Sequence, residues 1–380
     1  MGDRVFVGSC AGRFYCLDRR TGTEVWSYDI TQDGAQRSFH GDPLVAGELI
    51  LVGTDGDGIG HVYAFEHATG KVRWKHPITH TTERGGGLPT DLVRLDSSVF
   101  GVALGDELLS LDLETGRLNW SFRSQFSDFR FAWTSTPAAA GDRVFFGGLD
   151  GTIYALAARS GRVLWKREVG PSIHSSVTLV GEDIVVGSAN GHLYRLAQAT
   201  GNVVADVDLG APPWGRFLVA GDALLMFAGR GDAASVVCVD LTSNRVRWSQ
   251  RPDGVLNTSR PYLWHGAVLT GNEGGDLFVY RLSDGQLERS FHIDGGARGI
   301  GITDEALYVG TLGGTLYALD APRPEEPKTR VGAIDFFGTA GLDLDKIRAA
   351  LRVRQGDEIA HDQVEEAVGR IRQAVRQVTG

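Results

Sequence analysis

Residues that can bind an anion recur in the segments that precede a series of short apolar strands. Arginine dominates them, and its planar guanidinium offers paired donors to a carboxylate. In a protein of net charge −9, a ring of such residues predicts a site for a carboxylate-rich ligand or an acidic peptide. The alternative is that ordinary solvated arginines fall in these segments by chance. The candidates are Arg37, His40, Arg84, Arg130, Trp133, His174, Trp214, Arg216, Arg260 and Arg298.

Metal binding and nucleophilic catalysis have weaker support. The segment "GTDGDGIG" at 53–60 places Asp55 and Asp57 with the glycine spacing of part of a calcium loop. No glutamate closes that loop, and a long hairpin turn has the same composition. The ten histidines include no HExxH motif, and no G-x-S-x-G segment is present. We therefore assign no catalytic residue and no firm metal ligand, and we expect no cofactor.

An internal repeat supplies the elements that must position these residues. Eight copies, numbered repeat 1 to repeat 8, align on one apolar position at intervals of 39 to 48 residues. The mean period of about 43 residues matches one four-stranded propeller blade. The aligned residues are Leu17, Phe65, Leu111, Leu156, Leu196, Val239, Tyr280 and Leu319.

Each copy has the same order of elements. A short apolar strand such as "RVFFGG" is followed by a turn with glycine, an alternating strand such as "TIYALA", a Thr-Gly or Ser-Gly corner and a third strand. A less regular strand, such as "TPAAAG", precedes the next copy. Short strands joined by hairpins predict antiparallel sheets. The predicted fold is all-β: an eight-bladed β-propeller of four-stranded antiparallel blades, with seven blades as the alternative and a small C-terminal α/β or helical segment.

A corner motif predicts how the blades join. "CLDRRTGTEVW" at 16–26 returns as "AFEHATGKVRW" at 64–74 and "SLDLETGRLNW" at 110–120. The acid can accept hydrogen bonds from turn amides, and glycine leaves a bare backbone surface. An indole can pack on that surface in the neighbouring blade while its N–H reaches a carbonyl. This packing role is predicted for Trp26, Trp74, Trp120, Trp165 and Trp248, and for Gly22, Gly70, Gly116 and Gly161.

These corners resemble the tryptophan-docking motif of the pyrroloquinoline quinone (PQQ)-like propeller repeats, over roughly residues 1–325. That family includes PQQ-dependent alcohol dehydrogenases and BamB, an outer-membrane assembly lipoprotein. Repeats 5 and 7 depart from the motif, with Ala205 and Arg289 where Trp belongs, and repeat 8 has no Trp strand. The dehydrogenase branch implies PQQ and calcium in a central channel, covered by a disulfide between adjacent cysteines. Cys10 and Cys16 are not adjacent, so no catalytic residue is carried over and PQQ is not expected.

The character of the sequence changes after a Pro- and charge-rich linker. "RVGAIDFFG" predicts a strand, and two helices are predicted beyond it, the second with an apolar stripe that begins at Val364. This order resembles the first half of a polypeptide-transport-associated (POTRA) domain, in which two more strands would follow. The alternative is a generic amphipathic helix that packs on the propeller. The predicted domains are the propeller at 1–325, the linker at 326–332 and the POTRA-like segment at 333–380.

Composition restricts the partners and the compartment. A net charge of −9 and a pI of about 5.6 argue against a nucleic-acid partner. No run of 18 apolar residues predicts a transmembrane segment. The first residues show no signal peptide, so we expect the protein in the periplasm or cell envelope if a leader was removed, and otherwise in the cytoplasm.

Two functions remain open from the sequence. The first, by resemblance to BamB, is a non-catalytic scaffold for protein partners, such as components of envelope or outer-membrane protein assembly. The second is an enzyme or a small-ligand sensor that binds a PQQ-like quinone or another carboxylate at the central channel. The absence of assignable catalytic groups favours the scaffold, although fold alone does not decide between the two.

Overall fold

The computed structural model describes residues 3–79, 85–126, 135–258 and 260–319, and the backbone of 81–82, 320, 329–330 and 358–359. The chain divides into two compact units, one of residues 1–302 and 307–318 and the other of 303–306 and 319–380. Strands dominate the described residues, and two short 3-10 turns, η1 (Ile30–Asp33) and η2 (Gly231–Ala233), are their helical elements. In this part of the chain no helix has both the length and the apolar character needed to cross a bilayer.

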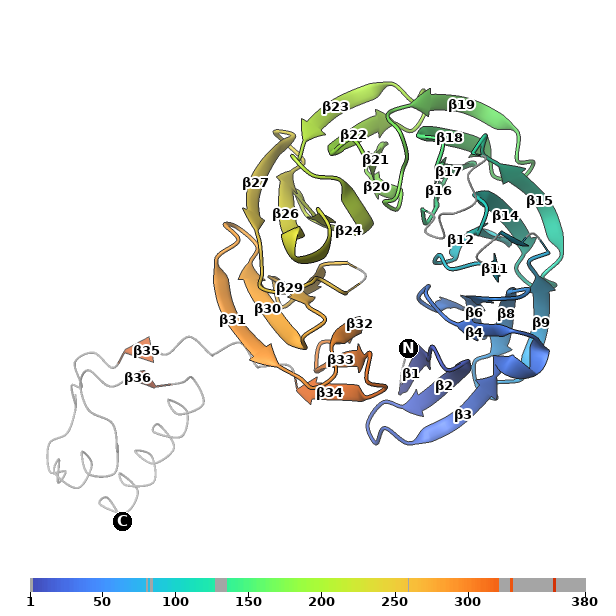
Figure 1. The fold of residues 1–380 in the computed structure, drawn as a ribbon, viewed down its shortest axis with the longest axis horizontal. Helices are drawn as coiled ribbons and strands as arrows, with labels where there is room; N and C mark the ends of the chain where they lie inside the picture. The colour runs from blue at the N-terminus through green and yellow to red at the C-terminus, as the bar shows by residue number, and fades with distance from the viewer. Residues whose placement is uncertain are drawn as a thin grey trace, which may run out of the picture. The chain divides into compact units, whose positions relative to one another are not determined.

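The larger unit is a succession of antiparallel meanders arranged around a common centre (Figure 1). Repeats 2 to 7 each form a four-stranded sheet, and repeats 1 and 8 form three-stranded sheets. In each four-stranded sheet the first strand is innermost and the last is outermost (Figure 1). The all-β class and the antiparallel four-stranded repeats are confirmed.

The first four repeats have these strands. Repeat 1 consists of β1 (Arg4–Gly8), β2 (Arg13–Asp18) and β3 (Glu24–Asp29), and repeat 2 of β5 (Leu44–Ala46), β6 (Leu49–Gly53), β8 (His61–Glu66) and β9 (Val72–Pro77). Repeat 3 consists of β12 (Val93–Leu95), β13 (Ser98–Ala103), β14 (Glu107–Asp112) and β15 (Leu118–Arg123), and repeat 4 of β16 (Ala138–Ala140), β17 (Arg143–Gly147), β18 (Thr152–Ala157) and β19 (Val163–Glu168).

The last four repeats continue the series. Repeat 5 consists of β20 (Thr178–Val180), β21 (Asp183–Gly187), β22 (His192–Ala197) and β23 (Val203–Asp208), and repeat 6 of β24 (Pro213–Ala220), β25 (Ala223–Ala228), β26 (Ser235–Asp240) and β27 (Arg245–Gln250). Repeat 7 consists of β28 (Tyr262–Trp264), β29 (Ala267–Gly271), β30 (Asp276–Arg281) and β31 (Leu287–His292), and repeat 8 of β32 (Ala297–Ile302), β33 (Ala306–Thr311) and β34 (Leu316–Asp320).

The apolar core lies between neighbouring sheets. One cluster joins Phe14 and Trp26 of repeat 1 to Ile50 and Phe65 of repeat 2, and similar clusters join the following pairs of repeats up to repeat 7. The sheets of repeats 2 to 6 are therefore covered on both faces. This is why second strands such as "LILVG" are buried at every residue instead of alternating between apolar and polar residues.

The five predicted tryptophans join each repeat to the next as expected. Each indole lies on a corner glycine of the following repeat, so that a methyl group added to Gly116 would come within 2.3 Å of Trp74. Each indole N–H donates to the carbonyl three residues before that glycine, at 2.9–3.1 Å. The accepting residues are His67, Leu113, Ala158, Gln198 and Leu282.

Three of the four predicted corner glycines receive an indole, and two further glycines do so as well. Gly70, Gly116 and Gly161 receive an indole, whereas a methyl group added to Gly22 would meet no described atom within 4 Å, so that the docking role of Gly22 stays a prediction. In the sequence, repeat 8 has no tryptophan strand. Gly201 and Gly285 receive Trp165 and Trp248 in the same way, although the sequence analysis did not name them.

The acid of the corner motif has its predicted role. Oδ1 of Asp18 accepts hydrogen bonds from the amide of Thr21 at 2.8 Å and from its hydroxyl at 2.9 Å. These bonds favour the carboxylate and lower the pKa of Asp18. Oδ1 of Asp112 accepts the same pair of bonds from Thr115. The corner is therefore fixed by its own residues, whether or not an indole lies on it.

The joint between repeats 5 and 6 is built differently. Ala205 stands where Trp belongs, and Arg195 lies opposite it on β22. Nη1 of Arg195 donates at 2.8 Å to the carbonyl of Leu241, the position that accepts an indole elsewhere. Asn244, with φ +52°, replaces the corner glycine and lies 3.4 Å from the same guanidinium nitrogen through its Oδ1. A large and a small residue have thus exchanged strands at this joint.

An additional sheet lies among the loops of repeats 1 to 3. It consists of β4 (Gln36–Ser38), β7 (Asp55–Gly56), β10 (Thr81–Thr82) and β11 (Gly85–Gly87), in the order β10-β11-β7-β4. The amide of the fully buried Gln36 donates to the carbonyl of Ile30 at 3.2 Å and to the hydroxyl of Tyr63. This bonding fixes the entry to repeat 2.

The second unit contributes one described pair of strands. β35 (Thr329–Arg330) pairs antiparallel with β36 (Glu358–Ile359). The predicted strand at "RVGAIDFFG" begins in β35, and β36 lies in the segment expected to connect two helices. The rest of the predicted POTRA-like segment lies outside the described residues, so that resemblance remains a prediction.

Candidate functional site

The innermost strands bring seven side chains to equivalent positions around the centre of the larger unit. Each lies four residues before the last paired residue of its strand, such as Ala46 in β5 or Ala220 in β24. Equal offsets on equivalent strands place these residues at one level. We call them the inner ring: Asp42, Asp91, Thr136, Ser176, Arg216, Arg260 and Arg298.

Charge is segregated around the inner ring. Repeats 2 and 3 contribute the two carboxylates, repeats 4 and 5 two hydroxyls, and repeats 6 to 8 three guanidinium groups. Neighbouring members contact one another: the amide of Asp42 donates to Oδ1 of Asp91 at 2.7 Å, and the amide of Asp91 to the Thr136 hydroxyl at 3.4 Å. The ring therefore has an acidic side and a basic side.

Arg216 connects the two sides. Its Nη1 donates to the carboxylates of both Asp42 and Asp91, which lie 174 and 125 residues away in the chain. A β-bulge in β24, with Gly215 in the left-handed region at φ +72°, turns Arg216 out of the regular strand path. β24 lies across the ring from β6 and β12 (Figure 1). This contact, which we call the clasp, ties repeat 6 to repeats 2 and 3.

The clasp is largely withdrawn from water. The side chains of Arg216 and Asp91 are 13% and 18% exposed. Burial alone would lower the pKa of Arg216, but the carboxylates of Asp91 and Asp42 raise it above its ordinary value. Burial raises the pKa of Asp91, and the Arg216 guanidinium opposes that shift. Each of the two charged groups is therefore stabilised by the other, because burial has removed most of the surrounding water.

The other two arginines of the inner ring have weaker partners. The guanidinium of Arg260 lies over the ring of Tyr262, 5.1 Å from its centroid, and its buried Nε has no hydrogen-bond partner among the described residues. Arg298 is exposed and donates from Nη1 to Oδ1 of Asn257 at 3.1 Å. Together they form the part of the inner ring best able to receive an external anion.

The other predicted anion-site residues that the structure describes lie at different positions from the inner ring. The indole of Trp214 packs against Phe227, at 5.1 Å between ring centroids, and its N–H donates to the Gly229 carbonyl. His174 lies 3.0 Å from the hydroxyl of Ser172, and Arg37 is exposed on β4. Arg84, Arg130 and Trp133 lie outside the described residues.

Asp55, the first acid of the suggested calcium loop, is paired with a histidine. Oδ2 of Asp55 lies 2.9 Å from Nδ1 of His40, so this carboxylate faces a histidine. Asp57 is exposed on the same turn. No group of three or more His, Cys, Asp or Glu side chains in the described ranges is arranged to hold a metal ion. Asp55 is therefore engaged with His40 in this structure, and the calcium role stays a prediction.

Sequence reasoning missed the acidic half of the inner ring. It selected arginine, histidine and tryptophan from whole loops and did not count back from the hairpin that ends each inner strand. In four of these hairpins the residue directly after the last paired residue of the inner strand is a left-handed glycine, namely Gly47, Gly141, Gly181 and Gly221. The ring residue lies five positions earlier in each case. Counting from that glycine would have placed Asp42 and Arg216 at the same level.

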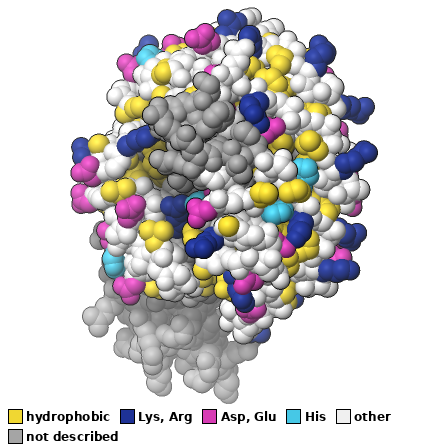
Figure 2. All heavy atoms as spheres, turned by 45° about the vertical axis from the view of Figure 1, so that its right-hand side comes forward, with side chains coloured by type: hydrophobic (Ala, Val, Ile, Leu, Met, Phe, Trp, Pro, Cys, Tyr) yellow, Lys and Arg dark blue, Asp and Glu magenta, His cyan; other side chains and the backbone are white. Residues whose placement is uncertain are grey.

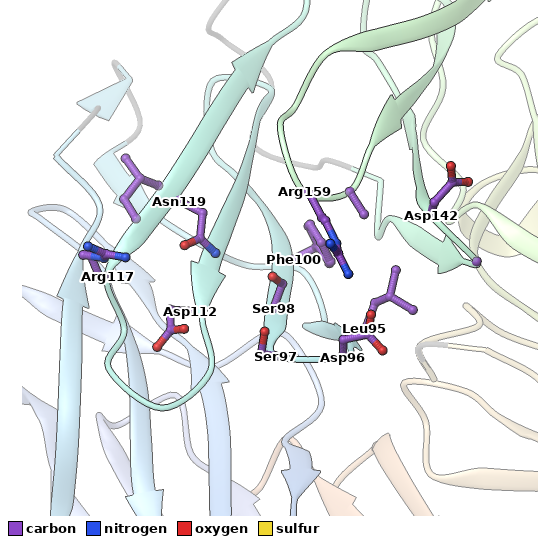
Figure 3. Close-up of a pocket in the computed structure, with 13 residues that line it drawn as sticks. Leu95, Asp96, Ser97, Ser98, Phe100, Asp112, Arg117, Asn119, Asp142 and Arg159 are labelled. Carbon is purple, nitrogen blue, oxygen red and sulfur yellow. The ribbon is translucent and has the colours of Figure 1, made fainter.

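A cavity of about 710 Å³ opens between repeats 3 and 4. Figure 3 shows Asp112 and Asn119 of repeat 3 and Arg159 of repeat 4 around the same opening. The Ala158 carbonyl that accepts the Trp120 indole also lines it. The cavity therefore lies along a joint between repeats, away from the inner ring, and its lining is mixed in charge.

Comparison with known proteins agrees with this architecture. The family described as outer membrane protein assembly factor BamB matches residues 1–205 and again residues 189–288. The two matches together span more than half of the chain. The protein belongs to the BamB family.

Individual relatives place the chain within a wider fold group. BamB of Yersinia pestis is 23% identical over 333 residues, which cover 83% of this chain and 82% of that protein. The crystal structure of BamB from Moraxella catarrhalis superposes with a TM-score of 0.70 at 18% identity, covering 84% of this chain and 94% of that one. A quinohemoprotein alcohol dehydrogenase of Pseudomonas putida is 36% identical over 77 residues, 20% of this chain and 11% of that enzyme.

The inner ring of this BamB-family protein does not fit PQQ. A quinone that bears carboxylates needs free cationic donors and, in the dehydrogenases, a calcium ion. Here Arg216 is already paired with two carboxylates, and those carboxylates would repel an anionic quinone. At the clasp, the cationic donors that a carboxylate-bearing quinone would need are therefore already occupied.

The outer surface carries an apolar band. The last strand of several repeats exposes one or two large aliphatic side chains near its start, with 37–53% of each accessible to solvent. Figure 2 shows hydrophobic side chains interspersed with lysines and arginines on one face of the molecule. We call these aliphatic residues the outer band: Val25, Leu118, Val163, Val203, Val204, Val246 and Leu287.

Proposed function

We propose that this protein is a non-catalytic scaffold that holds polypeptide partners during the assembly of outer-membrane or other envelope proteins. The observation that carries the proposal is the match of the BamB family to most of the repeat region. Relatives named as outer membrane protein assembly factors align along about four fifths of their own length. The matched quinoprotein segment covers only a fifth of this chain.

The geometry supports a rigid platform with an accessible rim. The clasp ties opposite repeats through charges that are largely withdrawn from water, which resists deformation of the inner ring. The outer band places aliphatic side chains on the outermost strands, where a partner can reach them. These strands also have one unpaired edge each, which can accept an extended segment. We place the partner on this rim and the protein in the cell envelope.

We further propose that the larger unit is a closed ring of eight blades. The hydroxyl of Tyr308 in repeat 8 lies 3.5 Å from the carbonyl of Arg19 in repeat 1, the position that accepts an indole at other joints. The first and last repeats would therefore be neighbours joined at the usual place by a different donor.

Arg260 and Arg298 supply a second proposed contact. Since the clasp uses both carboxylates of the inner ring, these two guanidinium groups are the ones available to acidic side chains of a partner. This contact replaces the small carboxylate ligand considered from the sequence.

Deletion of the gene in its native host tests the scaffold function. We expect a lower ratio of folded to unfolded outer-membrane or envelope proteins in the deletion strain, measured by heat-modifiability on gels and by quantitative envelope proteomics. The wild-type gene should restore the ratio, and a version with aspartate at Val163, Val203 and Val246 should not. An unchanged envelope proteome in the deletion strain would overturn the proposal.

A further inference from the structure

The outer wall of repeats 2 to 4 is basic, although the protein is acidic overall. The corner and outermost strand of these three repeats together have eight lysines and arginines and one acid, Glu168, in a chain of net charge −9. Every lysine among residues 1–320 lies there. The equivalent segments of repeats 1 and 5, residues 21–29 and 200–208, have two acids each and no lysine or arginine. We call the region between them the basic wall: residues 69–77, 115–123 and 160–168.

One cation of the basic wall recurs at the same position in all three repeats. Lys71, Arg117 and Arg162 each follow directly after the corner glycine that receives an indole. All three residues are exposed, and their side chains form no ion pair with any described residue. In the flanking repeats 1 and 5 the equivalent residues are the uncharged Thr23 and Asn202. We call Lys71, Arg117 and Arg162 the basic row.

The charge of the basic row is not neutralised by the protein itself. Three other cations of the wall, Arg73, Lys75 and Arg123, each have a carboxylate partner. In repeat 6, which also has an arginine-rich outermost strand, two carboxylates bind Arg247. The basic row has no such partners, so it keeps its positive charge available to another molecule.

The cavity between repeats 3 and 4 lies at the basic row. Arg117 belongs to its lining together with Arg159, and neither has a carboxylate partner among the described residues (Figure 3). Of the three acids in the lining, Asp112 binds the threonine of its own corner, and Asp142 pairs with the next residue in the chain. Asp96 alone is exposed and unengaged by a cation. The free charge of the opening is therefore positive.

The same cavity offers apolar surface beside this charge. Phe100 is fully buried at its base, Leu95 is half-buried, and Leu118 is 43% exposed. With a volume of about 710 Å³, the cavity has room for more than one apolar side chain. A ligand that fits both the row and the cavity must therefore have negative groups and an apolar group.

An extended polypeptide fits this surface better than a membrane or a nucleic acid. The strands β9, β15 and β19 follow one another along a curved outer wall (Figure 1). A flat bilayer can meet only part of a convex wall, whereas a chain can follow it. Nucleic acids are held without sequence preference by stacking on aromatic side chains, but the tryptophans of these strands are packed on corner glycines. Exposed Leu118 and Val163 instead suit a partner with apolar side chains.

We infer that the basic row and the adjoining cavity form a docking site for an extended acidic segment of a partner polypeptide. Carboxylates of the segment pair with Lys71, Arg117 and Arg162, and an apolar side chain between them enters the cavity. The charges direct encounter and register, and burial of the apolar side chain slows release. This inference rests on the proposed scaffold function and deepens it by naming the chemistry of the partner.

A synthetic acidic peptide tests the site. The probe is a fluorescently labelled peptide of about 20 residues, able to reach about 65 Å when extended, with leucine at every third position and glutamate elsewhere. We expect it to bind the full-length protein saturably in fluorescence anisotropy, and at least 10-fold more weakly when NaCl is raised from about 50 to about 500 mM. The same peptide with lysine in place of glutamate should not bind. No saturable binding of the acidic peptide, or equal binding of the basic one, would overturn the inference.

Two charge-reversal variants locate the binding. Replacing the basic row, as Lys71→Glu, Arg117→Glu and Arg162→Glu together, should weaken binding of the acidic peptide at least 10-fold. The control makes the same change of charge at exposed arginines of the outer wall of repeats 6 and 7, as Arg245→Glu, Arg251→Glu and Arg289→Glu. It should change binding less than 2-fold. If the first variant fails to fold, glutamine replaces glutamate at the same positions; equal binding by the row variant and the control would refute the site.

A second pair of variants tests the cavity. Leu118→Ser should weaken binding at least 3-fold because it removes apolar surface at the opening. Leu287→Ser is the control, since Leu287 also lies two residues after a corner glycine and is 48% exposed. Equal affinities of the two variants would overturn the role of the cavity.

Further probes separate the possible outcomes. Tighter binding to vesicles containing phosphatidylglycerol, or to a single-stranded oligonucleotide, that is lost in the row variant would overturn the polypeptide assignment. Binding of the acidic peptide without any envelope defect in the deletion strain would keep the docking site and remove the assembly function. An envelope defect that the row variant fully complements would remove the docking site alone.

Discussion

Asp106, directly before β14, is a buried carboxyl group without a counter-ion among its described hydrogen-bond partners. Its side chain is fully buried and its φ is +62°. Oδ2 accepts bonds from the Ser124 hydroxyl and from the amide of Leu149 at 2.8 Å, while Oδ1 has no partner in the described part of the chain. Burial raises the pKa of Asp106 to about 7, because one oxygen alone cannot replace the lost hydration.

Stability should therefore fall as the pH rises through this range. The carboxyl group loses its proton near 3.8 in the unfolded chain and near 7 in the folded one, so the folded state binds more protons between these values. Over that window we expect a loss of at most about 4 kcal/mol. Urea unfolding at pH 4.5 and pH 8 measures it. Asp106→Asn should abolish this part of the pH dependence, and the exposed control Asp57→Asn should retain it; equal slopes in both variants would contradict the assignment.

At the scale of elements, the indole joint can be measured by paired glycine substitutions. Gly116→Ala combines left-handed strain, about 1–2 kcal/mol, with a clash against Trp74 that adds about 1–3 kcal/mol. Gly22→Ala carries the strain alone, because its corner is empty. In thermal unfolding, Gly116→Ala should therefore be less stable than Gly22→Ala by the contribution of the clash with Trp74. Equal melting temperatures would show that the indoles contribute little at these joints.

The exceptional joint between repeats 5 and 6 gives a second prediction. Arg195→Ala removes the bond to the Leu241 carbonyl and the ion pair with Asp183, and should cost about 1–3 kcal/mol in the free energy of unfolding. Adding Ala205→Trp and Asn244→Gly should recover at least half of that loss, because these changes rebuild the common joint. Chemical denaturation of the single and triple variants provides the measurement. No recovery would mean that Arg195 does more than replace an indole.

Sequence predicted the elements well because each repeat states the same pattern again. The spacing of Thr69-Gly70 and Trp74 is local information, and repeats 1 to 4 all contain it, with serine in place of threonine in repeat 4. The exchange at Arg195 could not be predicted from the sequence because it involves two paired strands. The arginine lies on β22, and the residue that replaces the tryptophan lies on β23. Only the register, which pairs Arg195 with Ala205, makes the two substitutions one event.

For the whole molecule, the clasp predicts a large effect on stability from a single arginine of β24. Arg216→Ala leaves Asp91 without its counter-ion and should destabilise the protein by about 3 kcal/mol. Adding Asp91→Asn should restore part of the loss by removing the uncompensated charge. Arg298→Ala, at the equivalent position but exposed, should change the melting temperature little. A similar effect from both arginine variants would argue against a clasp.

The inner ring shows where sequence reasoning stopped. Arg216, Arg260 and Arg298 were selected from the sequence because arginine stands out near the start of an inner strand, and the anion site predicted for them stays a prediction. Asp42 and Asp91 were not, since an aspartate before a strand is ordinary turn chemistry. That Arg216 meets these two acids depends on ring closure over more than a hundred residues and on the bulge at Gly215. Neither the ring closure nor the bulge can be recognised from a short stretch of sequence.

A propeller of similar repeats can misassemble, because any repeat can pack against the wrong neighbour while the chain folds. The Arg195–Asn244 contact has a consequence here. On this side repeat 5 has no tryptophan to place on a glycine corner, and repeat 6 has no bare glycine surface to receive an indole, so these two surfaces fit each other and not the surfaces of the indole joints. One irregular joint thus marks the position of every other repeat along the circle.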